Sequence, residues 1–355
     1  MDIIFSYLVR QYCRTLINVL SISILLLLIT SAFDVLMRYK SVDLEFGQLL
    51  KLIYYKVPYL VSEISPLLSV FSVLAYLIWL IQTNQLINIF NSGFSILILV
   101  KLVVLVNLIY GLIILIIIAP LSSFLLSKHQ DLEQYLNKEE YSKIYNNIII
   151  KEELKSQQRF ICIKKVDLDS NLLESVTILT IKDKFFDNKL ECKSAKMGNQ
   201  KWLLSSCISY SNNIITTISN LDFSTQITPK NISHYLRPIY NVSIWQMPIM
   251  IKAAEKLGAQ TKILELYYYK QICRVFLTIL ISLIPFYFLK ANKSQIFNHI
   301  VDTLVMGFFM FLGINILTNL LIHYINSAIM CNIIPVALCL FTTIIQIRHT
   351  CRYPI

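Results

Sequence analysis

Six apolar stretches, each close to the length that crosses a bilayer, constrain this chain more than any other feature. A spanning helix needs about 20 apolar residues, because each residue adds about 1.5 Å to a helix and the hydrocarbon core is about 30 Å thick. The predicted spans are 16–36, 59–81, 96–119, 269–289, 301–321 and 327–347. The chain is therefore predicted to be an integral membrane protein with three spans on either side of a polar middle.

The composition argues against an ordinary soluble enzyme. Of the 355 residues, 56% are hydrophobic and 15% are charged, and the mean hydropathy is +0.61. The first apolar stretch follows Arg10 and Arg14, as a secretory signal would, but its length and the later spans predict an uncleaved helix. The net charge of +11 includes no basic run interleaved with aromatic residues, so the sequence predicts no binding to nucleic acid.

The distribution of basic residues predicts that both termini lie in the cytoplasm. This orientation places on the cytoplasmic side, as the positive-inside rule expects, Arg10, Arg14, Lys290, Lys293, Arg348 and Arg352. The loop 37–58 would then be external although it holds four basic residues. Either the statistical rule fails here, with two acidic residues compensating in part, or Arg38 and Lys40 bind an anionic headgroup. The sequence leaves both interpretations open.

The polar middle predicts an antiparallel β domain. Segments rich in β-branched and aromatic residues alternate there with polar turns, and the predicted strands are 159–166, 173–182, 189–197, 201–209 and 214–223. The run Met197–Lys201 is typical of a hairpin, because Gly and Asn accept a positive φ. Strands in series without intervening helices favour a sandwich or jelly roll.

The predicted fold class is thus a membrane α-helical protein with 3+3 transmembrane helices and an inserted antiparallel jelly-roll domain. Three regions follow from this assignment. They are the first three spans at 1–120, the β domain with flanking helical segments at 121–265, and the last three spans at 266–355.

Three cysteines, Cys162, Cys192 and Cys207, lie in the predicted β domain. The last two are equally distant from a turn at 199–200 and are the candidates for one bridge. An odd count and the absence of C-x-x-C favour unpaired buried thiols over a disulfide framework or a metal site.

The sequence contains none of the common catalytic or metal motifs. No glycine begins a G-x-x-x-x-G-K-[ST] loop, and neither G-x-S-x-G nor H-E-x-x-H occurs. The five histidines are scattered and favour solvated or interfacial positions. Glu63 and Asp302 lie at the edges of spans, where solvated carboxylates are expected. We therefore predict no catalytic residue, no metal and no cofactor, and hence a transport or scaffold protein.

Several local motifs, taken in order, resemble one family. They are Pro66-Leu67-Leu68 in the second span, the run Gln85–Ser95, Ala119-Pro120 closing the third span, Gly198 with Trp202-Leu203-Leu204, and Asn332 with Pro335. Their order and spacing resemble the LptF/LptG (YjgP/YjgQ) family of lipopolysaccharide export permeases over nearly the whole chain. The run Asp34–Arg38 is more similar to the LptG branch.

The resemblance implies a mechanism and partners. Two such permeases pair in the Gram-negative inner membrane, lipid enters between spans one and five, and a dimeric LptB-like ATPase in the cytoplasm closes the cavity. A periplasmic bridge of LptC/LptA-like proteins then receives the lipopolysaccharide. The missing ATP-binding motif is consistent with hydrolysis in a separate partner, and no enzyme activity is implied for this chain.

The resemblance also implies site residues. A coupling segment at 82–95 would offer apolar side chains to the ATPase, and the family usually has glutamate where this chain has Gln85. The coupling candidates are Gln85, Leu86, Ile89, Phe90 and Gly93. The candidates for binding lipid phosphate are Arg38, Lys40 and Lys128, and those for a lateral gate are Phe308, Phe309 and Phe311.

Two functions from different classes remain open. The first is a permease subunit of an ABC transporter that extracts lipopolysaccharide and passes it to the bridge. The second is a non-transporting scaffold that presents a periplasmic β domain, and it predicts that substitutions in 82–95 leave export intact.

Overall fold

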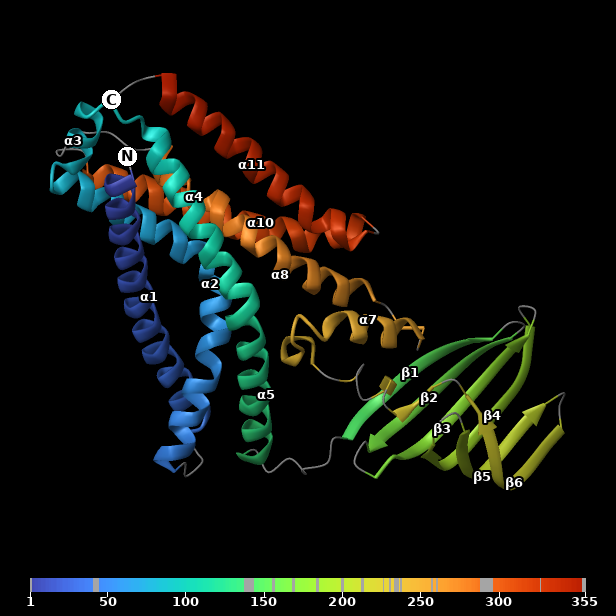
Figure 1. The fold of residues 1–355 in the computed structure, drawn as a ribbon. Coiled ribbons are helices and arrows are strands. Elements are labelled where there is room, and N and C mark those ends of the chain that lie inside the picture. The colour runs from blue at the N-terminus through green and yellow to red at the C-terminus, as the bar shows by residue number, and fades with distance from the viewer. Residues whose placement is uncertain are drawn as a thin grey trace. The chain divides into compact units, whose positions relative to one another are not determined.

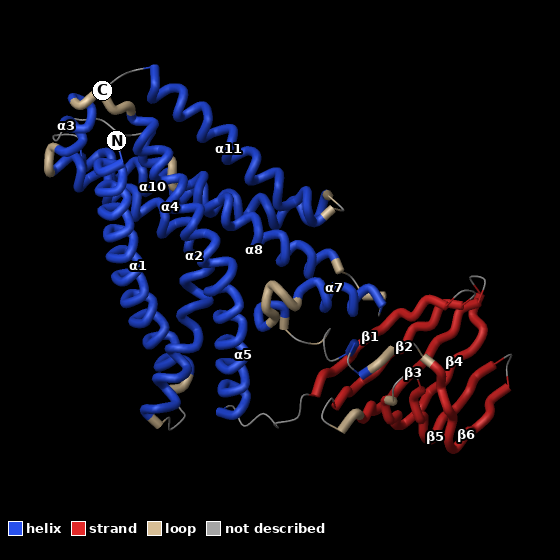
Figure 2. Tube along the Cα trace, viewed as in Figure 1, coloured by secondary structure: helices blue, strands red, loops and turns tan. Residues whose placement is uncertain are grey.

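The computed structural model describes most of the chain as two compact units. The residues left undescribed are 1, 41–44, 137–143, 155–156, 168–169, 183–184, 199–200, 212–213, 226, 230, 233–235, 237, 257, 260, 288–295, 326 and 353–355. The first unit comprises 1–132 and 265–355, and the second comprises 133–264. Figure 2 shows that the first unit is helical and that the strands belong to the second.

The helical unit contains six helices that are long and apolar enough to span a membrane, as predicted. In chain order its elements are α1 (Asp2–Arg38), α2 (Phe46–Gln82), α3 (Gln85–Asn91), α4 (Ile96–Ile113), the π-helical turn η1 (Ile114–Ile118), α5 (Ala119–Leu136), α8 (Lys262–Ile281), α9 (Ile284–Tyr287), α10 (Ile296–Tyr324) and α11 (Ala328–Arg352). The N-terminus and α3 lie at one end of this unit, and the end of α1 and the start of α2 lie at the other (Figure 1).

The third span runs without interruption through α4, η1 and α5. Its wide π-helical turn ends just before Ala119-Pro120. A proline ring clashes with the carbonyl group four residues earlier and donates no hydrogen bond, so a regular α-helix would be broken here. The π-helical turn accommodates this ring and keeps the span continuous.

The packed part of the helical unit lies between α1, α2 and α4. Its fully buried side chains include Leu8, Tyr12, Tyr76, Leu80 and Leu99. The Tyr12 hydroxyl donates to Asn107 Oδ1 at 3.1 Å, and Asn107 Nδ2 donates to Ser282 Oγ at 2.9 Å. A polar relay thus joins α1, α4 and the residue that follows α8.

The second unit is built on one six-stranded antiparallel sheet in the order β1 to β6, so each strand pairs with the next along the chain. The strands are β1 (Ile144–Leu154), β2 (Gln157–Asp167), β3 (Leu172–Lys182), β4 (Phe185–Met197), β5 (Lys201–Ser211) and β6 (Ile214–Ser224). The short helix η2 (Ile239–Asn241) and α7 (Met247–Lys256) follow. The five predicted strands and their insertion between the third and fourth spans are confirmed, and β1 is additional.

A crease crosses the whole sheet. Along one line the pairing skips one residue in every strand, and these residues lie opposite each other on neighbouring strands. They are Asn147, Lys164, Ser175, Lys193, Ser206 and Ser219. Ser175 and Ser206 have φ of 51° and 54°. On β2, Ile163 and Val166 are both buried although three residues apart, whereas a flat strand would place them on opposite faces. The sheet therefore bends along this line, with one continuous apolar inner face.

The inner face of the sheet is covered at one end by the chain itself. Ile227 and Ile232, which follow β6, pack into the same buried cluster as Trp202. Trp202 is fully buried, and its Nε1 donates to the carbonyl oxygen of Ile227 at 3.3 Å. This part of the sheet has a packed core.

Two edge regions of the sheet meet through a buried polar cluster. Thr225 Oγ1, just after β6, donates to Glu152 Oε1 of β1 at 2.8 Å. Arg159 Nη1 of β2 donates to the Ser224 carbonyl oxygen at 2.9 Å and lies 3.5 Å from Glu152 Oε2, and its guanidinium lies over the Phe223 ring. The sheet is therefore curled enough for its first and last strands to be joined at this corner.

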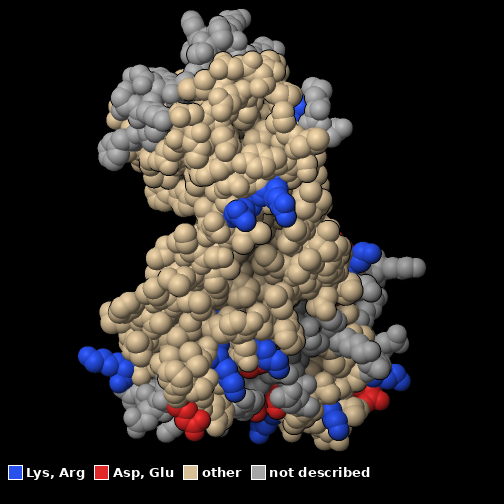
Figure 3. Space-filling view, turned by 60° about the vertical axis from the view of Figure 1, so that its left-hand side comes forward, with Lys and Arg blue, Asp and Glu red and all other residues tan. Residues whose placement is uncertain are grey.

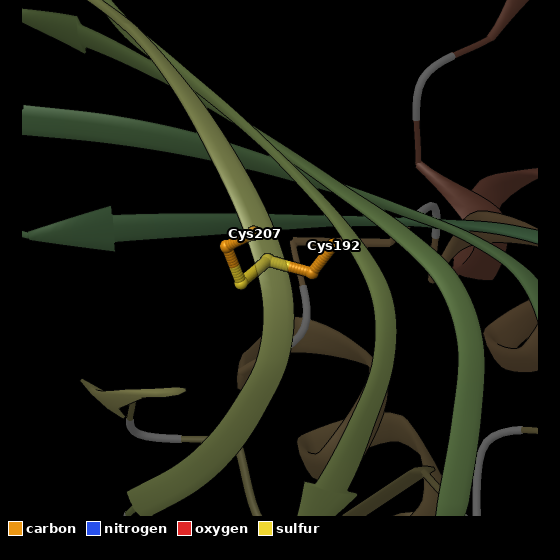
Figure 4. Close-up of a disulfide and its surroundings, with 2 residues drawn as sticks. All are labelled: Cys192 and Cys207. Carbon is orange, nitrogen blue, oxygen red and sulfur yellow. A yellow bond between two sulfur atoms is a disulfide. The ribbon is translucent and has the colours of Figure 1, made fainter. Parts of the chain in front are cut away.

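The expectation of unpaired thiols in the β domain was wrong. Cys192 and Cys207 form a disulfide between neighbouring strands (Figure 4). They are paired directly across β4 and β5, and their Cα atoms are 4.1 Å apart. Facing positions this close on an antiparallel pair bring the two thiols together. Cys162 is free.

The hairpin between β4 and β5 was predicted correctly, but the role of its glycine differs. A Cβ atom at Gly198 would lie 2.5 Å from the carbonyl oxygen of Lys201. Glycine is therefore required by a close backbone contact. The predicted turn residues 199–200 lie outside the described part of the chain.

Candidate functional site

The predicted lipid-binding residues Arg38, Lys40 and Lys128 are all exposed. Arg38 ends α1, Lys40 follows it, and Lys128 lies in the second half of α5. Figure 1 places the ends of α1 and α5 at the same end of the helical unit, away from α3. The structure thus brings the three residues to one end of the bundle, and their role in lipid binding stays a prediction.

A further basic residue at this end was not among the predicted candidates. Lys56 Nζ of α2 lies 2.6 Å from Asp34 Oδ2 of α1, and Asp34 also interacts electrostatically with Arg38. Asp34 thus interacts with Lys56 and Arg38, and Lys40 follows Arg38 by two residues along the chain.

A buried ion pair joins α2 to α8 inside the helical unit. Arg274 is 5% exposed, and its Nη2 donates to Glu63 Oε1 at 2.7 Å. Its Nη1 donates to Ser62 Oγ at 2.9 Å and to Gln271 Oε1 at 3.1 Å. Glu63, expected as a solvated carboxylate, is 27% exposed, and it is also paired with a residue of another span 211 positions away. Arg274 was missed, since only its position inside the apolar stretch 269–289 marked it.

Two more contacts fix α8 against the first three spans. Ser69 Oγ of α2 donates to the carbonyl oxygen of Thr278 at 2.9 Å. A Cβ atom at Gly111 of α4 would lie 2.9 Å from Thr278 Oγ1, so glycine allows α4 and α8 to approach closely. Small residues and interhelical hydrogen bonds are the usual means of holding membrane helices together. The α8 helix is therefore anchored at successive turns.

The predicted coupling segment forms the short helix α3 and the turn after it. Leu86 and Ile89 are 1% and 8% exposed and pack into the bundle core, whereas Ile87 is 44% exposed. Gln85 Nε2 donates to the Tyr7 hydroxyl at 3.2 Å, so this side chain is bound to α1. Phe90 is half-buried. Ile87 is thus the exposed apolar side chain of this helix.

The turn after α3 depends on Gly93. Its φ is +79°, and a Cβ atom there would meet nothing within 4 Å. The positive φ, and not crowding, explains why glycine occupies this position. Beside the turn, two cavities of about 200 and 220 Å³ lie between the start of α1 and the α3–α4 region, and both are lined by Ile4, Leu8, Ile89 and Phe94.

The gate candidates on α10 divide into two groups. Phe308 and Phe309 are 47% and 66% exposed and stack edge to face at 6.1 Å. Phe311 instead packs against the cluster of Val70 and Ile284. The spans in α1 and α10 are each only 11% buried within the chain, the lowest values of the six. These two helices therefore have the most surface left for lipid or another subunit.

The outer face of the sheet carries an exposed ion pair. Lys189 Nζ lies 2.6 Å from Glu191 Oε1, two residues along β4 on the same face. The hydrogen bond between them lowers the pKa of Glu191 and raises the pKa of Lys189.

No group of three or more His, Cys, Asp or Glu side chains that could hold a metal occurs among the described residues. His129 differs from the expectation for the histidines, because it is 6% exposed. It also interacts with another group of the chain. The histidines therefore suggest no site.

The comparison with protein families agrees with this architecture of six spans and an inserted sheet. No curated protein matches the chain. The family described as the lipopolysaccharide export system permease LptF/LptG matches residues 6–349, nearly the full length. The chain belongs to the LptF/LptG family of lipopolysaccharide export permeases.

Proposed function

We propose that this chain is one permease subunit of an ABC transporter that extracts lipopolysaccharide from the inner membrane and passes it to a periplasmic bridge. The match to the export permeases over 6–349 carries the proposal. The sparsely covered α1 and α10 support it, because a paired LptF/LptG-type subunit and entering lipid would both need such surfaces.

The disulfide supports a periplasmic β domain. Disulfides persist in the bacterial periplasm and are rare in the reducing cytoplasm. Because three candidate spans precede the second unit and three follow it, both termini would be cytoplasmic if that unit is periplasmic. The α3 helix then lies on the cytoplasmic side, where an LptB-like dimeric ATPase would bind it.

Energy for extraction would come from that ATPase, since the chain has no ATP-binding loop of its own. Gln85, where the family usually has glutamate, donates a hydrogen bond to Tyr7, whereas Ile87 is exposed. We expect the ATPase to contact α3 through this apolar side chain.

Purification of the tagged protein from native membranes in mild detergent tests the proposal. Mass spectrometry should identify a second six-span permease, an ATPase with a Walker motif, bridge proteins of the LptC/LptA type and bound lipopolysaccharide. Recovery of the chain alone, under conditions that preserve other membrane complexes, would favour the scaffold function instead.

Replacing Ile87 by aspartate should reduce recovery of the ATPase about 10-fold or more, because an apolar anchor at an interface is worth about 1–3 kcal/mol. Leu97 is 45% exposed at the start of α4, and Leu97→Asp gives a matched control. Equal recovery of the ATPase with Ile87→Asp and with the wild type would exclude α3 as the docking helix.

Replacing Arg38 and Lys40 together by alanine should weaken lipopolysaccharide binding about 10- to 30-fold while leaving the fold intact. Each basic residue near an anionic surface contributes about 1 kcal/mol, and both side chains are exposed. Retention of lipopolysaccharide by the purified variant in detergent measures the effect, with Lys252→Ala, exposed on α7, as the control. Unchanged retention would show that these residues only depart from the positive-inside rule.

A further inference from the structure

Arg10 and Arg14 lie deeper in the helical unit than the sequence alone predicts. Tyr12, midway between them on α1, donates a hydrogen bond to Asn107 of α4. Asn107 lies within 102–127, a run without charged residues, six positions beyond Lys101. At about 1.5 Å per residue, Tyr12 is level with a point about 9 Å inside this run from Lys101.

The packing of α2 gives the same depth. The Tyr76 hydroxyl donates to the carbonyl oxygen of Leu8 at 3.4 Å. Tyr76 precedes the end of α2 at Gln82 by about two helical turns. Both neighbouring spans therefore place Arg10 and Arg14 beside apolar stretches that cross the bilayer.

The two arginines face away from the protein. Leu8, Tyr12 and Leu16 form the buried face of α1, whereas Arg10 and Arg14 are exposed. Neither arginine has a hydrogen bond or ion pair within the part of the chain that the structure describes. Figure 3 shows a small group of basic side chains in the middle of a broad uncharged surface. Two cations on a face of a membrane-spanning helix that no described part of the chain covers need an anionic partner.

The geometry of α1 indicates where this partner lies. Side chains on a helix tilt toward its N-terminus, so both guanidinium groups can extend toward the nearer headgroups while their stems stay in hydrocarbon. Residues four apart lie on the same face about 6 Å from each other. Two planar guanidinium groups at this spacing suit the phosphate of one lipid, because a guanidinium group can donate two parallel hydrogen bonds to a phosphate.

We propose that Arg10 and Arg14 form a binding site for an anionic phospholipid in the leaflet on the N-terminal side of the membrane. This site differs from the one proposed for the transported lipid. Arg38 lies 28 residues further along the same helix, about 42 Å away. A bound phospholipid would fix the depth of α1, which has little protein cover.

Selective retention of an acidic phospholipid tests the site. The full-length protein is reconstituted in nanodiscs of phosphatidylcholine with a minor fraction of phosphatidylglycerol, and lipids that remain after gentle delipidation are counted by native mass spectrometry. The wild type should retain phosphatidylglycerol preferentially, and R10Q/R14Q should lose this preference about 10- to 30-fold, since each basic residue contributes about 1 kcal/mol. R10K/R14K should retain only part of it, because lysine reaches the headgroups but cannot form the two parallel hydrogen bonds of arginine.

Two controls separate the possible sources of binding. Lys252→Gln removes an exposed basic side chain of α7, outside both proposed lipid sites, and should leave the preference unchanged. Inorganic phosphate should not compete, because the site is reached through the bilayer. Equal retention by R10Q/R14Q and the wild type, with similar melting temperatures, would overturn the proposal. So would a photoreactive residue at position 14 that cross-links to an acidic segment of a protein and not to lipid.

Should R10Q/R14Q fail to fold, the single variants Arg10→Gln and Arg14→Gln replace it. In each single variant the preference for phosphatidylglycerol should fall about 5-fold, because one of the two guanidinium groups remains. Single variants that both match the wild type would overturn the proposal in the same way.

Discussion

Replacing Arg274 by alanine is expected to lower the stability of the helical bundle by about 2–4 kcal/mol. The variant leaves Glu63 in a span without the guanidinium that now lies 2.7 Å from its carboxylate. Removing one partner of a fully buried pair costs about 3–5 kcal/mol, and the lower range applies because the Glu63 side chain is 27% exposed. Thermal unfolding of the purified protein in detergent, followed by tryptophan fluorescence, measures the loss.

Removing both charges distinguishes the ion pair from simple packing. The double variant Glu63→Met with Arg274→Met should recover most of the lost stability, because apolar side chains of similar volume often replace a buried pair without cost. Lys262→Ala, at the first residue of α8, provides a matched control near the end of the same helix. If Arg274→Ala unfolds at the same temperature as the wild type, the pair does not hold α8 against α2.

The elements of this fold that depend on local pattern could be predicted from the sequence. Each span is marked by its own length and hydropathy, and β2 to β6 are marked by β-branched residues between turns. β1 was missed, because Asn146 and Asn147 interrupt its apolar alternation and its neighbours are polar. The crease could not be predicted either, because it appears only when Lys164, Ser175 and the corresponding residues align across six strands.

The contacts of the candidate site depend on which helices pack together, and a single sequence does not state this. Glu63 is paired with Arg274 because α2 and α8 meet, and nothing near either residue in the chain indicates it. For the same reason Leu86 was predicted as part of a docking surface, whereas it is buried in the core of the bundle. Ile87, its neighbour, has the exposed position.

Reducing or removing the Cys192–Cys207 disulfide is expected to destabilise the β domain by about 3 kcal/mol. The bridge closes a loop with a sequence separation of 15, and a loop of that length corresponds to about this loss in the chain-entropy account. Both sulfur atoms also belong to the buried inner face, so reduction leaves two thiols in a packed core. The double variant Cys192→Ala with Cys207→Ala removes the bridge and a small amount of buried apolar surface as well.

Thermal unfolding of the purified protein with and without dithiothreitol separates the bridge from the packing. Reductant should lower the melting temperature of the wild type and of Cys162→Ala, whose thiol is free, and should leave the double variant unchanged. A periplasmic domain should also show the oxidised pair in cells when thiols are trapped before lysis. Free thiols at both positions in trapped cells would remove the support that the bridge gives to the proposed orientation. A wild type that is insensitive to reductant would show that the sheet pairing alone holds β4 and β5 together.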